Sequence, residues 1–136
     1  MRGYDAPVTP NETTEIVDYD PHWPAQFAGE RDRVRIGLGL FHLRYEHVGD
    51  TAVPGRRSKP VVDVLLGAPP AAWAALPDVR ARLVALGYDD LGEAAPGRFA
   101  FRRRTLRAFD LALVELDGAE WTATIAERDR LRAQES

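Results

Sequence analysis

Apolar and polar residues recur along this chain with two periods, one typical of helices and one typical of strands. In the first helical stretch Phe27, Val34 and Leu38 fall near helical spacing, while Glu30 and Arg31 take other faces. The helical period predicts helices over residues 24–40, 77–86 and 119–132, and a helical turn over residues 71–76.

Shorter stretches either alternate between apolar and polar residues or are almost wholly apolar, as strands do. They cover residues 43–48, 61–66, 88–91, 98–105 and 109–116, with a loop expected over residues 92–97. The last two stretches are expected to pair as a hairpin. The apolar run predicts a strand buried on both faces, with Val61, Asp63 and Leu65 on the same one. The order of elements therefore predicts an α+β fold, a mixed β-sheet with helices packed on one face.

Length and composition are those of one domain that follows a tail. The chain has 136 residues, 45% of them apolar, which is enough for one hydrophobic core. Residues 1–15 contain Pro7 and Pro10 but no apolar core of a signal peptide, so we interpret them as a flexible N-terminal tail before a domain over residues 16–136. No apolar run approaches the ~20 residues that span a membrane. We expect no membrane partner and a cytoplasmic location.

Net charge and cysteine content exclude some classes of partner and of catalytic site. The net charge is −3, whereas a protein that binds nucleic acid by general attraction would be basic, so we do not expect nucleic acid as a partner. The chain has no cysteine, which excludes disulfides, thiolate zinc sites and cysteine nucleophiles. These bounds favour a small-molecule substrate.

The strongest candidate chemistry lies in residues 46–66. The first strand breaks at Gly49, and a loop that contains Gly55 and Lys59 leads to the strand of Asp63. Glycine lets backbone N–H groups approach a phosphate closely, and a lysine neutralises its charge. A carboxylate on the following strand could hold a divalent metal ion against the same phosphates. The pattern therefore favours a ligand that bears phosphate.

The same stretch also resembles a known family. Residues 47–55 (His-Val-Gly-Asp-Thr-Ala-Val-Pro-Gly) and 59–64 (Lys-Pro-Val-Val-Asp-Val) resemble the signature of the GrpB family, which is similar in fold to the nucleotidyltransferases of the DNA polymerase β superfamily. Shorter matches flank this signature, at residues 17–24, 86–88, 98–101 and 127–132. The resemblance covers roughly residues 16–133 and implies a minimal nucleotidyltransferase-like fold. It supplies no substrate, because the activity of the family is inferred from its fold more than from known reactions.

The resemblance implies roles for residues of the site. A nucleoside triphosphate would lie on the loop, with the substrate-binding residues Gly49, Asp50, Thr51, Gly55 and Lys59. Mg²⁺ would be held by Asp63 and Asp50. Arg98 and Arg102 lie on a strand expected to flank the site, and arginine gives bidentate recognition of phosphate or carboxylate groups.

The chain also departs from the superfamily pattern. Asp50 rather than serine follows Gly49, and Leu65 stands where a second acid would follow Asp63. The family has a histidine on a late strand, where this chain has Ala112. A two-metal site would need a further acidic ligand, which Asp50, Asp110 or Glu46 could supply. Asp110 is for this reason a candidate catalytic acid.

Several candidates have a structural alternative. Asp63 could form a salt bridge with Arg98 or Lys59 instead of binding metal, and Lys59 could be a solvated loop cation. Asp50 could close a local Asx turn. His47 is a candidate catalytic residue beside the loop, but a lone histidine could equally serve as a hydrogen-bonded structural residue.

Three functions remain open from the sequence. The first is a Mg²⁺-dependent enzyme that transfers a nucleotidyl group from a nucleoside triphosphate to a small-molecule acceptor. The second is a catalytically degenerate module that binds a nucleotide or metabolite without turnover. The third is a biosynthetic enzyme of different chemistry in the same pocket, with His47 or Asp63 as general base. Exposed edge strands could also support a homodimer.

Overall fold

A computed structural model of the chain describes residues 15–135. The predicted tail, residues 1–15, lies outside the described residues except for Glu15. The elements are α1 (Trp23–Leu38), the 3₁₀ turn η1 (Gly39–Phe41), β1 (Arg44–Val48), the 3₁₀ turn η2 (Asp50–Ala52), β2 (Val61–Ala68), α2 (Pro70–Ala74), α3 (Leu76–Ala85), β3 (Asp89–Ala95), β4 (Arg98–Arg104), β5 (Ala108–Glu115) and α4 (Ala119–Glu135).

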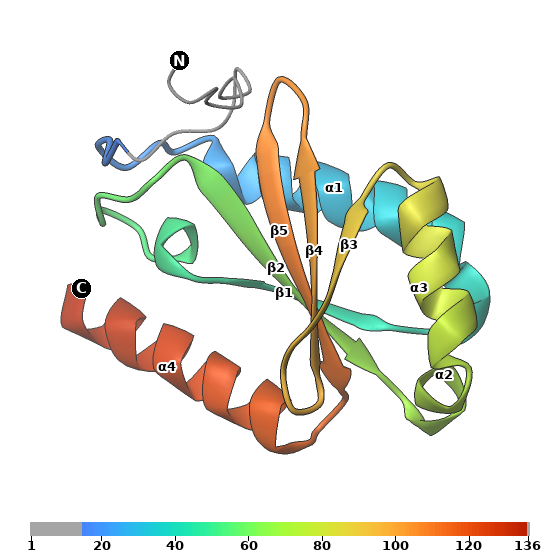
Figure 1. Ribbon diagram of the computed structural model, residues 1–136. Helices are drawn as coiled ribbons and strands as arrows, with labels where there is room; N and C mark the ends of the chain where they lie inside the picture. Colours follow the sequence, from blue (N-terminus) through green and yellow to red (C-terminus); the bar gives the residue numbers. More distant parts are fainter. Residues whose placement is uncertain (1–14, 136) are drawn as a thin grey trace, which may run out of the picture.

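The strands form one five-stranded mixed sheet in the order β1-β2-β5-β4-β3 (Figure 1). β2 runs parallel to β5, and the other neighbours are antiparallel, including the β4–β5 pair that the sequence predicts as a hairpin. The register aligns Asp63 of β2 with Val48 of β1 on one side and with Asp110 of β5 on the other. The predicted α+β mixed sheet is confirmed.

The sheet has two different faces because side chains alternate along each strand. Val62, Val64 and Leu66 of β2 pack into the main core beneath α1, α2 and α3, which confirms the predicted helix-covered face. Leu65 lies on the other face, in a smaller cluster with Val114 of β5 and Trp121 of α4. Helix α4 therefore packs on the face opposite the other helices (Figure 1), which corrects the prediction that all helices pack on one face; the apolar residue Trp121 holds it there.

One predicted loop is wrong. Residues 92–97 were expected to be irregular, but β3 continues to Ala95 and pairs with β4. The pairing shifts register between Asp90 and Gly92 and again between Glu93 and Ala95, and such bulges accommodate a residue like Gly92, whose φ is +83°. The free edge of β4 supplies hydrogen-bond partners that the local sequence does not reveal.

One predicted surface position on α1 is also wrong. Glu30 lies on the buried stripe of α1 together with Trp23, Val34 and Leu38. It is only 6% exposed, and the pairing of its carboxylate with arginine makes this burial tolerable. Within residues 15–135, no helix is both long enough and apolar enough to cross a membrane.

Candidate functional site

Gly49 and Asp63 are brought into direct contact at the end of β1. Gly49 has φ of +75°, a backbone conformation that side chains with a Cβ rarely adopt. A Cβ atom at this position would lie 2.3 Å from Oδ2 of Asp63, well inside van der Waals contact. Only glycine therefore lets the Asp63 carboxylate lie against the backbone at the start of the loop.

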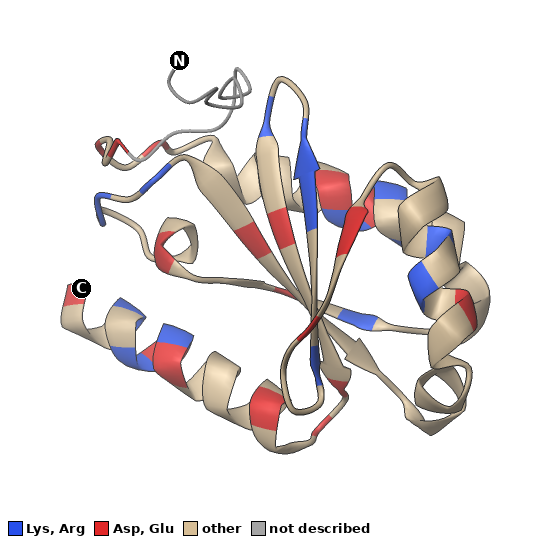
Figure 2. Ribbon diagram, in the orientation of Figure 1, with Lys and Arg blue, Asp and Glu red and all other residues tan. Residues whose placement is uncertain are grey.

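Asp63 is a carboxylate without a counterion. Among residues 15–135 it makes no ion pair, so the alternative of a salt bridge to Arg98 or Lys59 is not found. Burial raises the pKa of Asp63 to about 7, and the negative charges of Asp110 and Asp50 add to this effect. The acidic positions of β2 and β5 lie side by side on the sheet (Figure 2). Asp63 therefore titrates near neutral pH.

Asp110 is held by arginines of β4. Its Oδ1 lies 3.0 Å from Nη1 of Arg104 and 3.9 Å from Nε of Arg102. Within the described part of the chain, Asp110 Oδ1 and Arg102 Nε are nevertheless buried atoms without a hydrogen-bond partner. Buried polar atoms are normally hydrogen-bonded, so these two mark a place where a ligand could complete the site.

Two cavities meet at Asp63 and Asp110. The first, which we call the loop cavity, has a volume of about 370 Å³ and is lined by Ile16, Asp50, Ser58, Lys59, Val61, Asp63, Arg102, Arg104 and Asp110. Lys59 is exposed there and forms no ion pair with any residue from 15 to 135. The lining combines the cations Lys59, Arg102 and Arg104 with the carboxylates Asp50, Asp63 and Asp110, so the cavity is suited to an anion that arrives together with a metal cation.

The second cavity, which we call the helix cavity, lies between the sheet and α4. Its volume is about 550 Å³, and its lining includes Gly49, Asp63 and Asp110 together with Arg98 of β4. Most of its remaining wall is apolar or small, contributed by Val48, Val64, Ala100, Leu111, Ala112, Ala123 and Leu131. An organic molecule of moderate size fits such a cavity.

Helix α4 forms one wall of the helix cavity and is fastened by arginines. Arg98 donates hydrogen bonds to Glu120 (3.2 Å) and Thr124 (3.1 Å), both on α4. Arg128 of α4 donates to Oε1 of Glu46 on β1 at 2.6 Å, so this arginine fastens the last helix to the sheet.

The sequence reasoning missed the α4 residues that line the helix cavity. They are Ala123, Thr124, Glu127 and Leu131. Ala123, Glu127 and Leu131 follow at intervals of four residues, which places them on one side of a helix. This spacing would have been informative once α4 was known to cross the sheet.

His47 and Thr51 lie away from both cavities. The His47 side chain faces α1, where it stacks on Phe27 at 5.0 Å between ring centroids, and its Nε2 lies 2.9 Å from Oγ1 of Thr51. Thr51 is completely buried. Burial lowers the pKa of His47 to about 4, and the charges of Arg132 and Arg128 add to this effect. A neutral, buried imidazole of this kind fits the structural alternative.

The other predicted loop residues, Asp50 and Gly55, differ in their relation to the loop cavity. Asp50 lines the loop cavity and accepts a hydrogen bond from Nε of Arg56 at 2.9 Å, so neither a free carboxylate nor an Asx turn describes it. Gly55 has φ of +86° and open space around it, and it lines neither cavity. The positive φ of the turn is therefore the reason for a glycine at position 55.

The acids present fit a single Mg²⁺ better than a pair. No group of three or more His, Cys, Asp or Glu side chains able to hold a metal is found in residues 15–135. Mg²⁺ is commonly bound through one or two carboxylates plus substrate phosphates. Asp63 and Asp110, which lie side by side in the sheet register, supply two such carboxylates, although Oδ1 of Asp110 already lies 3.0 Å from Nη1 of Arg104.

These features define a protein of nucleotidyltransferase fold. The structure of Cid1 in complex with the UTP analog UMPNPP is similar with a TM-score of 0.60, covering 88% of this chain and 37% of that chain at 10% sequence identity. So low an identity shows the fold alone. The sequence profile of the GrpB family, described as GrpB protein, matches residues 13–136, and the chain belongs to this family.

Relatives agree with this assignment. The crystal structure of the conserved protein GrpB from Enterococcus faecalis has a TM-score of 0.77 and 25% identity, covering 89% of this chain and 74% of that chain. The UPF0157 protein PA4798 of Pseudomonas aeruginosa is 47% identical over 60 residues, which are 44% of this chain and 25% of that protein. The matched segment thus spans about a quarter of that relative's length.

Proposed function

We propose that this GrpB-family protein transfers a nucleotidyl group from a nucleoside triphosphate to a small-molecule acceptor. The observation that carries the proposal is the position of Asp63, a carboxylate without an ion pair in residues 15–135 that lines two cavities of different character. A transfer reaction needs a donor site and an acceptor site that share the reacting centre. The loop cavity and the helix cavity are the candidates for these two sites.

The loop cavity would take the triphosphate. Lys59 and Arg102 offer charge-assisted hydrogen bonds to phosphate oxygens. The complex of Cid1 with a UTP analog supports a nucleotide as donor, as a property of a protein that shares this fold. Thr51 and Gly55, which line neither cavity, would support the loop and not touch the ligand.

Mg²⁺ would be held by Asp63 and Asp110. Asp110 would join only if its Oδ1 gives up the ion pair with Arg104, and Asp50 only if its bond to Arg56 breaks. When bound there, Mg²⁺ would neutralise charge on the phosphates. Burial is the main cause of the raised pKa of Asp63, and repulsion by Asp110 and Asp50 adds to it. A cation in place would offset that repulsion, so metal binding favours the ionised form of Asp63.

The helix cavity would take the acceptor. Its mostly apolar wall suits the carbon skeleton, while Arg98 can orient a polar group. Asp63 lines both cavities, so its carboxylate faces the acceptor as well as the donor.

A second candidate is the binding module without turnover. It is favoured by the arginines on Asp110 and by Leu65, a completely buried apolar residue on the strand position where a second acid would stand. Chemistry that uses His47 as a base has less support, since that imidazole is buried on the other face of the sheet.

Thermal shift of the full chain separates these functions. ATP, GTP, CTP and UTP are each added with MgCl₂ or with EDTA, and a ligand at about 100 times its Kd should stabilise the fold by about 2.7 kcal/mol. We expect Mg²⁺-dependent stabilisation that Asp63→Asn abolishes and Lys59→Gln weakens. Arg57→Gln is the matched control, because Arg57 is a loop cation that lines neither cavity and pairs with exposed Asp18.

Three results decide between the candidates. Pyrophosphate release with one of a panel of small alcohols and amines would establish transfer. Binding that ignores EDTA, with no pyrophosphate, would favour the binding module. An absence of any nucleotide effect would overturn nucleotidyl transfer and also a module that binds a nucleotide.

The proposal includes a cytoplasmic location, where nucleoside triphosphates are available, and a small molecule as acceptor. A homodimer formed through an edge strand stays a prediction. Sedimentation of the full chain would test it.

A further inference from the structure

A third cavity lies on the opposite face of the sheet, between the first half of α1 and the turn that joins β4 to β5. Its volume is about 800 Å³, and its lining residues are Asp20, His22, Ala25, Gln26, Gly29, Glu30, Arg103, Thr105, Leu106, Arg107 and Phe109. It shares no residue with the loop cavity or the helix cavity. We call it the α1 cavity.

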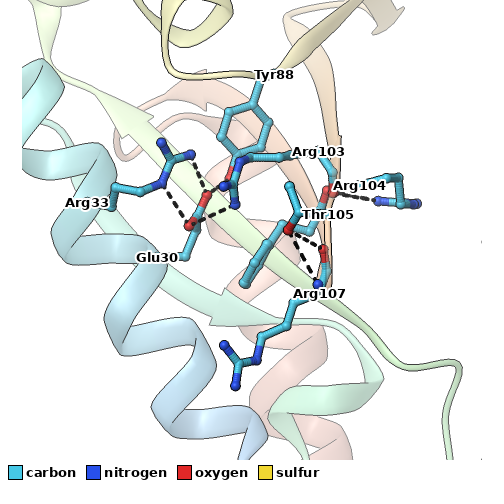
Figure 3. Close-up of polar contacts among 8 residues, drawn as sticks. Glu30, Arg33, Tyr88, Arg103, Arg104, Thr105 and Arg107 are labelled. Atoms are coloured by element: carbon cyan, nitrogen blue, oxygen red, sulfur yellow. Dashed lines mark hydrogen bonds and ion pairs between the residues drawn. The ribbon is translucent and has the colours of Figure 1, made fainter. Parts of the chain in front are cut away.

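The acids of the α1 cavity are already bound to partners. Glu30 accepts two hydrogen bonds from Arg33, at 3.1 and 2.9 Å, and another from the Tyr88 hydroxyl (Figure 3). Although burial opposes its ionisation, these bonds hold the pKa of Glu30 below its ordinary value. Asp20 accepts from the backbone N–H of His22 at 2.8 Å, which lowers its pKa.

The cations of the α1 cavity have capacity left. Arg103 donates a single long contact of 3.5 Å to Glu30. The Arg107 guanidinium extends away from this cluster (Figure 3), and among residues 15–135 it makes no hydrogen bond or ion pair, although its charge acts on Asp20. The surplus of donors over available acceptors means that the cavity is suited to an anion.

The rest of the wall leaves room for a flat apolar group. A Cβ added to Gly29 would meet no atom within 4 Å, so packing does not require glycine there. Glycine inside a helix costs about 1 kcal/mol relative to alanine. The small residues Gly29 and Ala25 of α1 line this cavity together with Phe109.

We propose that the α1 cavity binds a small organic anion, an aromatic ring that bears a phosphate or carboxylate group. Arg107 and the free N–H groups of Arg103 would bind the anionic group, while the ring would lie between Phe109 and the small residues of α1. The proposal does not depend on the nucleotidyl-transfer activity, because the two sites lie on opposite faces of the sheet.

Phenyl phosphate and benzoate are suitable probes, used in EDTA with the ¹⁵N-labelled full chain. We expect amide chemical shifts to change at Gly29, Thr105 and Arg107, and to stay constant at Gly49. Binding of inorganic phosphate or of phenol should be weaker by about tenfold or more, since each offers only one of the two contacts. Arg107→Gln should weaken binding of both probes without disturbing the fold, because the guanidinium is exposed.

Gly29→Leu supplies the sharper test. The new side chain occupies the place on α1 where the ring is expected, so it should abolish the shift changes while raising helix stability. Gly39→Leu is the matched control, since Gly39 is also exposed with open space around it but lies outside the α1 cavity. The proposal is overturned if Gly29→Leu binds the probes as the unaltered chain does, or if the shifts appear at Gly49 instead. Equal binding of inorganic phosphate would overturn the aromatic part.

Discussion

At the scale of single residues, Asp63 carries a charge that its surroundings oppose. It is a strand residue beside two other carboxylates, and among residues 15–135 no cation pairs with it. Functional groups are often held in such unfavourable surroundings, because a ligand that relieves the cost then binds more strongly. The cost should be visible as a pH dependence of stability.

The sign of that dependence follows from the two pKa values of Asp63. The folded chain keeps the proton up to about pH 7, whereas the unfolded chain loses it near the ordinary value of 3.8. Unfolding therefore releases a proton in this window, and the contribution of Asp63 to stability falls as pH rises from about 4 to 7.

We predict that Asp63→Asn becomes more stable relative to the unaltered chain as pH rises from 5 to 8. The relative gain should be about 2 kcal/mol, from about 1.4 kcal/mol per pKa unit reduced for partial exposure. Urea denaturation at the two pH values measures it. A difference that does not change with pH would mean that Asp63 is already ionised at pH 5.

His47 acts in the opposite direction and needs its own control. Its pKa is lowered to about 4, so the folded chain keeps it neutral while the unfolded chain protonates it below the ordinary value of 6.5. The contribution of His47 is thus lost as pH falls from 6.5 toward 4. The contribution of His47 to the pH dependence cancels when Asp63→Asn is compared with the unaltered chain, because both contain His47.

At the scale of elements, α4 is attached to the sheet by Trp121 and by arginine contacts. Of the arginines that make these contacts, Arg128 lies on α4 itself, and only 10% of its side chain is exposed. The side chain of its partner Glu46 is partly buried, with 29% of its surface exposed. A carboxylate in that position loses its main hydrogen bond when Arg128 is removed.

We predict that Arg128→Gln destabilises the chain by about 1–3 kcal/mol, the usual cost of a buried polar group left without its partner. The midpoint of urea denaturation measures this. Arg130→Gln is the matched control on the same helix, since the Arg130–Glu127 pair is solvent-exposed and should contribute little. Equal effects of the two substitutions would contradict the assigned role of Arg128.

Much of the fold follows from the sequence because each strand has a period of two. The alternation along β2 predicts Asp63 and Val64 on opposite faces of the sheet, and the alternation along β5 does the same for Asp110 and Leu111. Those side assignments are correct, and with the parallel register they bring the two acids together. The β3 extension to Ala95 was not predictable from local residues, since its hydrogen bonds come from β4.

The candidate site was harder to predict because register decides which side chains meet. His47 pairs in register with Val64 and so shares the core face, whereas Val48 pairs with Asp63. A shift of one residue would have exchanged these roles. Sequence spacing gives no such register, and the position of α4 over the site depends on tertiary packing around Trp121.

At the scale of the whole molecule, stability should be unevenly distributed. β2 and β5 are each paired on both sides and lie between helices on the two faces of the sheet. β3 is an edge strand with two register shifts, and none of its residues is fully buried. Helix α4 contributes Trp121 as its one fully buried residue among those described.

We therefore predict that native-state hydrogen exchange divides the chain into a slow centre and faster surroundings. Amides of Val64 and Leu111 should exchange only through global unfolding, while those of Glu93 and of the second half of α4 should exchange about 100-fold faster or more through local opening. NMR-detected exchange measures both. Because α4 forms one wall of the helix cavity, local opening of α4 would admit an acceptor without unfolding the sheet. Uniform protection of α4 and β2 would mean that the helix cavity opens by some other movement.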